Sequence, residues 1–483
     1  MKTLIAALLV TSGFACAGPG KGHPVPADRA LMHSAPAAAA AQQEFDTLPA
    51  AIGEKFLQAS LTPASLKALA MVPTPQDPTT KYALAGGPKN DDAKMALPLV
   101  LKSTTGPVTD EEIKGLDQYL LAYPLPRANI KNYHFRRLYV PAMLEWTYER
   151  TKNPALVVCA IRMAYSTAAH RNDRFGAEDI LGQGPLPLWP HYRDSSWQNG
   201  KLSLSAGIAD TAAIAWLTTP ARLIARHPEL WDKTLDGVTY KHIAFDLIRE
   251  AFKTTDFVMK DFRQPASQLL ICPDYWISEP KNEVPQWNRV FPFMSGTIPL
   301  IEALEAFHIE PARAAMLDQT NGAMIDFFWS KVRKIEANGK TVYVYPYGVA
   351  RLKDNPDQVE DFGHGGFDGR CLETFHHCGR YNFSSEQAQH LADTIALCCH
   401  APGIFSSRLD GGAPPRSKKS KKLEKYTYLD GLEGMIWYAA YRPEIHRNLV
   451  DYFFSDWKGK LDSGPVWEIL KLRELTDSAQ RHQ

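Results

Sequence analysis

The chain has 483 residues, of which 45% are hydrophobic and 22% are charged, a usage typical of soluble globular proteins. This composition excludes a disordered chain, a collagen-like chain and a protein with many membrane spans. Because 54 Lys and Arg face 53 Asp and Glu, the net charge is +1, and no overall field attracts nucleic acid. Attraction to an anionic polymer would have to come from local clusters of charge.

Residues 1–17 have the pattern of a secretory signal. Lys2 precedes an apolar run over residues 4–10 that is too short to span a bilayer. Ala15-Cys16-Ala17 fits a small-x-small cleavage site, so we expect an exported protein, periplasmic or extracellular. The alternative is a lipoprotein acylated at Cys16, although Gly13 stands where a lipobox prefers Leu. No later apolar run reaches spanning length, so we expect no transmembrane segment.

Residues 18–44 are rich in Ala, Pro and Gly and hold few side chains that could build a core. We expect them to form a flexible leader. The folded part is expected from Phe45 onward. No Ser- or Gly-rich linker divides it, so residues 45–483 are interpreted as one domain.

Six Cys in this domain have neither a CxxC motif nor a Cys/His spacing typical of zinc sites. We interpret them as small buried side chains, with disulfides as the alternative in an exported protein.

Apolar periods near 3.6 residues dominate the domain and predict about a dozen helices. Thr109-Asp110-Glu111-Glu112 is a helix start signal for the first, 113–123. The others, in chain order, are 135–151, 155–169, 206–218, 221–226, 242–257, 294–307, 311–332, 370–380, 385–399, 431–441 and 444–454. Between residues 332 and 349, Asn338-Gly339 beside an alternating run predicts a β-hairpin.

The fold class follows from this pattern of helices. Long aromatic and Pro-rich connections do not fit an alternating βα fold, and no Rossmann or P-loop glycine motif occurs. Helix pairs of roughly 40 to 60 residues suggest a solenoid or a closed toroid. We therefore predict an all-α protein, an (α/α)n toroid or incomplete barrel of paired helices with a small β-hairpin insertion.

The densest group of ionisable residues lies at 357–380. Glycines 363, 365 and 366 permit unusual backbone angles and the close approach of another segment, so we expect His364 in a tight loop. Asp368 is expected to cap the following helix. One interpretation is that His364 carries protons at the mouth of a cleft, oriented by a carboxylate. The other is a structural loop. No spacing singles out a metal site, and we expect no metal and no cofactor.

A second polar stretch, residues 272–293, is interrupted by four Pro and interpreted as a loop. Trp276 and Trp287 can stack on sugar rings, and Asn288 and Arg289 can hold a carboxylate. Tyr275 supplies a phenol. The alternative is a surface loop held in place by two buried Trp.

Weaker candidates lie elsewhere. Asn132, His134 and Arg136 open an early helix, and His191 and Tyr192 follow Trp189-Pro190 in a loop. Both groups are also compatible with ordinary polar surface. Three alternate Tyr, at positions 343, 345 and 347, share one face of the hairpin, which is either a binding face or a buried one. The basic run 416–425 is either a solvated loop or a lid that attracts a polyanion.

The strings QWNRVFPF (286–293) and EDFGHGGFDGR (360–370), in an exported helical protein, resemble the uronate-specific polysaccharide lyases with an (α/α) toroid. The closest resemblance is to polysaccharide lyase family 38, the glucuronan and alginate lyases, and it would cover residues 45–467. The NNH-type string of some other toroid alginate lyases is absent.

The resemblance implies β-elimination on a uronic acid polymer. A neutralised carboxylate acidifies the proton on C5, a base removes that proton, and an acid protonates the departing O4. His364 or a Tyr would be the base and a Tyr the acid, with Tyr275 and Tyr347 as the leading phenols. Asn288, Arg289 or Arg370 would neutralise the carboxylate. The expected substrate contacts are Arg370, Trp276, Trp287, His191, Tyr192, Asn132, His134 and Arg136.

Two other classes of function remain open. A glycoside hydrolase needs two carboxylates across the scissile bond, which Glu360, Asp361, Asp368 and Glu373 could supply. A non-catalytic glycan-binding envelope protein would bind oligouronates without shortening them.

Overall fold

The structure, a computed structural model of the chain, describes the following residues: 35–50, 52–60, 99–123, 125, 138–175, 186–189, 207–274, 281–353, 355, 357–414, 416, 431–456, 460–461 and 463–481.

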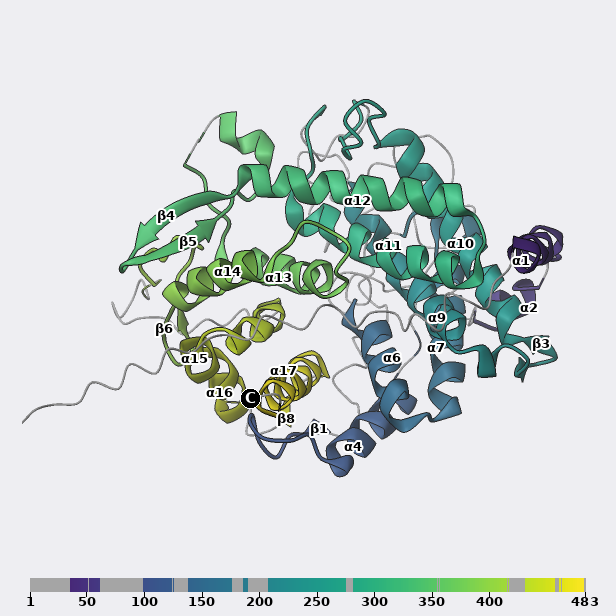
Figure 1. Cartoon of the computed structure of the whole chain (residues 1–483), viewed down its shortest axis with the longest axis horizontal. Coiled ribbons are helices and arrows are strands. Elements are labelled where there is room, and N and C mark those ends of the chain that lie inside the picture. Colours follow the sequence, from purple (N-terminus) through teal and green to yellow (C-terminus); the bar gives the residue numbers. More distant parts are fainter. Residues whose placement is uncertain are drawn as a thin grey trace, which may run out of the picture.

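The described chain is mostly helical, and its sheets are two-stranded antiparallel pairs, which confirms the predicted all-α class (Figure 1). The longer helices are α1 Ala35–Thr47, α4 Asp110–Leu121, α6 Tyr139–Thr151, α7 Pro154–Ala169, α9 Ala215–Arg226, α10 Tyr240–Asp261, α11 Trp287–Phe307, α12 Pro311–Lys331, α13 Phe362–His377, α14 Ser385–Cys398 and α17 Ser463–Arg481. The shorter ones are α2 Glu54–Ser60, α8 Asn172–Phe175, η3 Gly207–Ile214, η4 Pro228–Leu230, η5 Val349–Lys353, η6 Leu432–Ala440, α15 Pro443–Ile445, η7 His446–Val450 and α16 Asp451–Asp456. The strand pairs are β1 Leu99–Val100 with β8 Lys460–Leu461, β2 Thr234–Leu235 with β3 Val238–Thr239, β4 Arg333–Ala337 with β5 Lys340–Val344, and β6 Cys399–Ala401 with β7 Ile404–Phe405.

Local signals account for the elements predicted best. Thr109 and Glu112 form a reciprocal capping box at the start of α4, as their spacing indicates. In the hairpin, Asn338 (φ 53°) and Gly339 (φ 73°) both take positive φ between Ala337 and Lys340, as a two-residue type I′ turn requires.

Other element boundaries were predicted wrongly. Helix α11 begins at Trp287, inside the predicted loop, and contains Pro292 and Pro299 because its apolar side chains are almost all buried. Helix α13 begins at Phe362 rather than at 370, through the glycines expected to form a loop. Helix α1 starts at Ala35, within the expected leader, and Gln42 in it accepts a hydrogen bond from the backbone of Glu310 (2.7 Å). Packing contacts override local propensity at each of these sites.

Six helical elements contact one another in a cyclic order, and we call them the inner helices (Figure 1). Helix α6 packs on α9, α9 on α11, α11 on α13, α13 on η6, η6 on α17, and α17 on α6. Along the chain each inner helix follows one of the remaining long helical segments, which are α4, α7, α10, α12, α14 and the group from α15 to α16.

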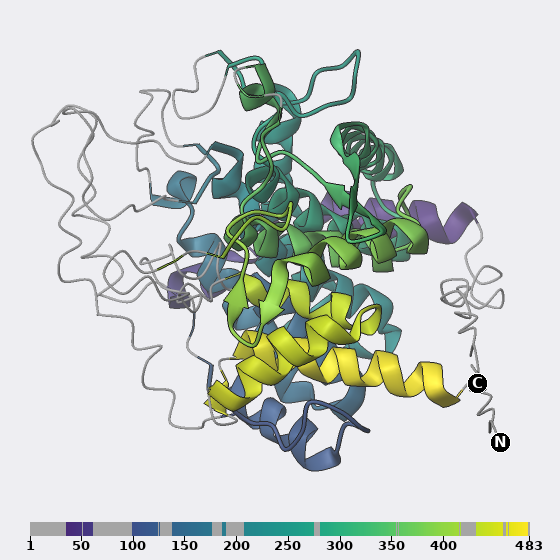
Figure 2. The ribbon, with the colours of Figure 1, turned by 90° about the vertical axis from the view of Figure 1, so that its left-hand side faces the viewer.

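The inner helices run in the same direction. Ser295 on α11 meets Cys371 on α13, and further along the chain Glu305 meets Arg380, just after α13. The residue numbers on the two helices therefore increase together from one contact to the next, as they do in parallel helices. In Figure 2, α17 is the yellow helix that leads toward the C-terminus. The same order holds for five further sets of two contacts, each set between two inner helices. They are Glu145–Arg222 with Glu149–His227; Thr218–Gly296 with Arg222–Glu302; Gly369–Trp437 with His376–Tyr441; Arg370–Glu468 with Glu373–Lys471; and Tyr139–Trp467 with Arg150–Glu474. The N-terminal ends of the inner helices thus lie at one end of the molecule, which we call the N-terminal face.

Glycines let α13 and η6 approach each other backbone to backbone. A Cβ on Gly366 would lie 2.3 Å from the carbonyl oxygen of Gly431, and one on Gly434 would lie 2.1 Å from that of Gly366. The expected close approach is therefore confirmed. The expected unusual backbone angles are not, because Gly363, Gly365 and Gly366 have no positive φ.

The six described Cys are free thiols, four of them buried, in agreement with the interpretation as small core side chains. Among the described helices, only α11 is long and apolar enough to cross a membrane, and 78% of its most apolar window is buried inside the protein. It therefore has the character of a core helix.

Candidate active site

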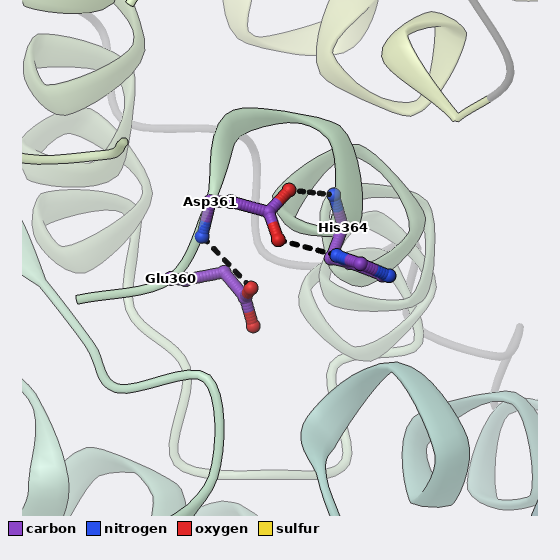
Figure 3. Close-up of side chains that lie close together, drawn as sticks. All are labelled: Glu360, Asp361 and His364. Carbon is purple, nitrogen blue, oxygen red and sulfur yellow. Dashed lines mark hydrogen bonds and ion pairs between the residues drawn. The ribbon is translucent and has the colours of Figure 1, made fainter. Parts of the chain in front are cut away.

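The start of α13 carries a histidine–carboxylate pair (Figure 3). Asp361 is the N-cap of the helix, and its Oδ1 accepts a hydrogen bond from the backbone N–H of His364 (2.9 Å). Asp361, not Asp368, is therefore the cap. Asp368 lies two turns into the helix and is completely buried. Asp361 precedes the first helical residue, where a side-chain acceptor satisfies the unpaired N–H groups of the first turn.

The His364 ring also bonds to Asp361, through Nδ1 and Oδ2. A bond to a carboxylate requires the proton on Nδ1, so in the neutral imidazole Nε2 carries the lone pair. Both side chains are 44% exposed, and Nε2 has no hydrogen-bond partner among the residues described. Burial opposes ionisation of Asp361, but the hydrogen bonds from His364 and Gly363 prevail and lower its pKa. His364 is thus an oriented, accessible proton acceptor.

Tyr347 packs against this pair. Its ring centroid lies 5.1 Å from that of His364, in an edge-on arrangement at 65°. Of the three alternate Tyr, Tyr343 and Tyr345 are buried, while Tyr347 is half-buried just beyond β5. The first two therefore belong to the core, and only Tyr347 joins His364.

The first turn of α11 lies at the same height along the parallel helices as His364. Two turns before the Cys371–Ser295 contact, the parallel register brings His364 opposite Asn288. The segment carrying Tyr347 also touches this end of α11, since a Cβ on Gly348 would lie 3.1 Å from Cγ of Gln286. Asn288 is 4% exposed and its Oδ1 has no hydrogen-bond partner among the described residues. Arg289 is half-buried.

Two predicted substrate contacts have structural roles instead. Trp287 is fully buried and meets the ring of Phe328 edge-on at 5.2 Å, so it cannot stack on a sugar. Arg370 is paired with Glu433 (2.7 Å) and stands over the ring of Tyr139, with its guanidinium carbon 4.7 Å from the centroid. It is therefore unavailable to neutralise a substrate carboxylate.

A pair of buried carboxyls lies beside the histidine. Glu360 and Asp368 are both completely buried, and Oε1 of Glu360 accepts a hydrogen bond from the backbone N–H of Asp361 (2.9 Å). Burial raises the pKa of both carboxyls well above the usual range, and the charge of Asp361 adds to the rise. Hydrogen bonds with Glu360 and with the Tyr345 hydroxyl oppose part of the rise in the pKa of Asp368. At neutral pH the pair therefore does not carry two uncompensated negative charges.

Glu360, Asp361 and His364 also have the composition of a metal site. One ligand atom from each lies within 4.8 Å of the others. The spacing along the sequence did not single out this group, because it depends on how the start of α13 turns.

Several predicted residues lie outside the described part of the chain, so their contacts are not described. They are Cys16, Asn132, His134, Arg136, His191, Tyr192, Tyr275 and Trp276, together with the signal at 1–17 and all of the basic run except the exposed Arg416. In the sequence, the polar stretches among them precede inner helices, namely α6, η3 with α9, α11 and η6.

Asp361 was not predicted as the partner of His364, although the sequence carries two signals for it. Asp361 stands directly before the apolar Phe362, and a cap three residues before a histidine places both side chains on one turn. The buried Glu360–Asp368 pair had no comparable signal, because burial of a carboxyl cannot be read from its spacing.

The comparisons with known proteins give no relative: no protein-family model, no curated protein and no solved structure matches the chain.

Proposed function

We propose that the protein is a polysaccharide lyase that cleaves a uronic-acid-containing polymer, such as glucuronan or alginate, by β-elimination. The observation that carries this proposal is the Asp361–His364 pair with Tyr347 against it, on the N-terminal face. An oriented imidazole and a neighbouring phenol are the base and the acid that an elimination needs. We further propose that the protein acts after export, with a lipid anchor at Cys16 as the less favoured alternative to cleavage.

We also propose that the inner helices form the inner wall of an (α/α) toroid. Their cyclic order of contacts, their common direction and their alternation with the remaining helices support this arrangement. In such a toroid, the connections that lead into the inner helices meet at one mouth. The polar stretches before α6, α9 and α11 would then surround His364.

The proposed reaction conserves protons and electrons. Nε2 of His364 takes the proton from C5, and Asp361 stabilises the imidazolium that forms. The electrons of the C5–H bond become the C4=C5 double bond as the C4–O4 bond breaks, and Tyr347 gives its proton to O4. Asn288 and Arg289, in the first turn of α11, are the candidates for neutralising the carboxylate, since Arg370 is engaged elsewhere.

Residues outside the described part complete the proposal. Tyr275 is the second candidate phenol, and the proposed contacts to an anionic polysaccharide are Asn132, His134, Arg136, His191, Tyr192 and Trp276.

The carboxylates weigh against a glycoside hydrolase at this place. Glu360 and Asp368 lie together in the core, Asp361 holds His364, and Glu373 is paired with Lys471 (2.7 Å). None of these four is left as an exposed pair across a bond of the substrate.

The test is to incubate the mature protein with glucuronan, alginate, hyaluronan, pectin and neutral glycans, and to follow the ultraviolet absorbance of the conjugated double bond. We expect absorbance to rise with a uronate polymer, and His364→Ala to lower kcat/KM roughly 100- to 10,000-fold. His377→Ala, an exposed histidine at the other end of α13, is the matched control and should retain activity. Shortened chains without absorbance would indicate a hydrolase, and binding without shortening would indicate a glycan-binding protein. Equal activity of His364→Ala and the wild type would remove His364 from the mechanism.

A further inference from the structure

Glu360 holds the start of α13 through both its backbone and its side chain. Its N–H donates to the carbonyl oxygen of Tyr345, just after β5 (2.8 Å), and its own carbonyl accepts from the N–H of Leu409 (3.0 Å). Its side-chain Oε1 accepts from the N–H of Asp361, the N-cap of the helix (2.9 Å). Three segments of the chain therefore meet at this one residue.

The side chain of Glu360 is held in turn by a buried chain of hydrogen bonds. Glu360 and Asp368 share a side-chain hydrogen bond, and the Tyr345 hydroxyl donates to Asp368. Tyr345 is thus connected to Glu360 twice, directly through its carbonyl and indirectly through its hydroxyl and Asp368. All three side chains are buried, and hydrogen-bonded polar groups in a core specify one arrangement of the segments that they join.

The hydrogen bond between the two carboxyls requires a proton, because carboxylates only accept. Burial raises the pKa of both groups well above the usual range, so a proton is retained at neutral pH. The bond between them adds to the rise at Glu360 and opposes the rise at Asp368, which favours the proton on Glu360. A protonated carboxyl at Glu360 then offers one acceptor to Asp361 and one donor to Asp368, as the amide of a Gln would.

The groups held in this way are the two that meet in the proposed site. Asp361 accepts from the backbone N–H and from the ring of His364. Tyr347 follows Tyr345 by two residues, and its ring centroid lies 5.1 Å from that of His364. We propose that Glu360 is a positioning residue, which joins Asp361 to the segment after β5 and so fixes the His364 ring relative to Tyr347. Its effect on turnover rests on the proposed function, whereas its effect on the ring does not.

The first test observes the ring without substrate. In the full mature chain with isotope-labelled histidine, nuclear magnetic resonance shows which ring nitrogen bears the proton, and His364→Ala identifies the signal. We expect the wild type to hold this proton on Nδ1 of His364, because that nitrogen donates to Asp361. Glu360→Met keeps the length of the side chain but offers no acceptor, and we expect a mixture of tautomers. Glu360→Gln should retain the wild-type signal.

Glu373→Met is the matched control. Glu373 is another buried carboxyl of α13, and it pairs with Lys471 (2.7 Å) away from the N-cap. The same substitution there should lower the thermal midpoint and leave the His364 signal unchanged, which separates loss of stability from loss of position. Asp368→Met removes the partner of the Glu360 side chain and should change the signal in the same direction as Glu360→Met. It replaces that variant if Glu360→Met does not fold.

The second test follows turnover of a uronate polymer. Glu360→Met should lower kcat roughly 10- to 100-fold with KM nearly unchanged, because a misplaced base slows the reaction without weakening binding. Glu360→Gln should keep turnover near the wild-type value. Expected spectra without elimination by the wild type would reject the lyase proposal and still support Glu360 as the residue that holds the ring.

Three outcomes would overturn the inference. The first is a wild-type His364 ring with its proton on Nε2, or with no single tautomer. The second is a wild-type signal in Glu360→Met and Asp368→Met alike. The third is a change of the signal in Glu373→Met or Glu360→Gln as large as that in Glu360→Met, which would show that the acceptor at Glu360 does not position the ring.

Discussion

Two groups of buried carboxyls on and around α13 have opposite surroundings. Glu360 and Asp368, near its start, have no Lys or Arg beside them among the described residues that influence their charge. Further along, Glu373, Glu433 and Glu468 surround Arg370 and Lys471, and we call these five residues the paired network. Burial is common to both groups, so ion pairing is what distinguishes the carboxyls that join the inner helices from the two that have no cation beside them.

The paired network is nearly balanced in charge. Three carboxyls meet two cations, and the surplus is visible at Glu468, whose pKa is raised to about 7 by burial and by Glu373 against the opposing effect of Lys471 and Arg370. The network connects α13, η6 and α17, so its role is to join three inner helices.

The largest expected effect is the loss of activity in Tyr347→Phe, at the site next to Glu360 and Asp368. If Tyr347 protonates O4, its loss should lower kcat/KM for a uronate polymer roughly 100- to 10,000-fold. The thermal midpoint should stay close to that of the wild type, because the ring and its contact with His364 remain.

Tyr441→Phe is the matched control, since its hydroxyl lies 3.3 Å from Nε2 of His376 at the opposite end of the inner helices. Equal loss of activity in both variants would show that the effect is not specific to the proposed site.

In the paired network, Arg370→Met should lower the free energy of unfolding by about 3 to 5 kcal/mol, because it leaves Glu433 and Glu468 buried without their cation. Urea unfolding measures this change. The double variant Arg370→Met/Glu433→Gln should recover part of the loss. A single variant as stable as the wild type would contradict the structural role given to the paired network.

Glu468 should make stability depend on pH. Its folded pKa of about 7 lies above the unfolded value of 4.5, so the folded state holds its proton longer. Stability should therefore fall as pH rises from about 4.5 to about 7, by up to about 3 kcal/mol, and level off above that range. Glu468→Gln should flatten this part of the profile relative to the wild type, as measured by urea unfolding at a series of pH values. A profile identical to that of the wild type would show that the surplus charge resides elsewhere.

The smallest effect is expected at Asp357, which belongs to the same dense stretch as His364. Its side chain is 93% exposed and its contact with Arg333 (3.1 Å) is a surface pair. Asp357→Asn should change the free energy of unfolding by no more than about 0.5 kcal/mol and leave activity unchanged. A large change in chemical unfolding or in turnover would mean that density of charge along the sequence, and not pairing, marks the functional residues.

The sequence predicted most of the fold through local signals. The capping box at Thr109 and the Asn338-Gly339 turn act within a few residues, so their outcome can be read without the rest of the chain. The early starts of α11 and α13 were not predicted, because Pro292 and the glycines are poor helix formers. Packing against the partners α9 and η6 explains why these segments are helical all the same.

The candidate site was less accessible to prediction. His364 and Tyr347 were expected and lie together, but the roles assigned to Trp287 and Arg370 were wrong. The residue type alone does not show whether an indole or a guanidinium contacts a substrate or packs in the core. Contacts between distant segments of the chain decide this.

The backbone contact between Gly366 and Gly434 has a consequence for motion. Because the two backbones already touch at these glycines, α13 has little room to slide against η6, and this contact helps to fix the helix that carries the His364 ring. Under the proposed function, the adjustment to an entering polymer would fall to the segment after β5 that carries Tyr347.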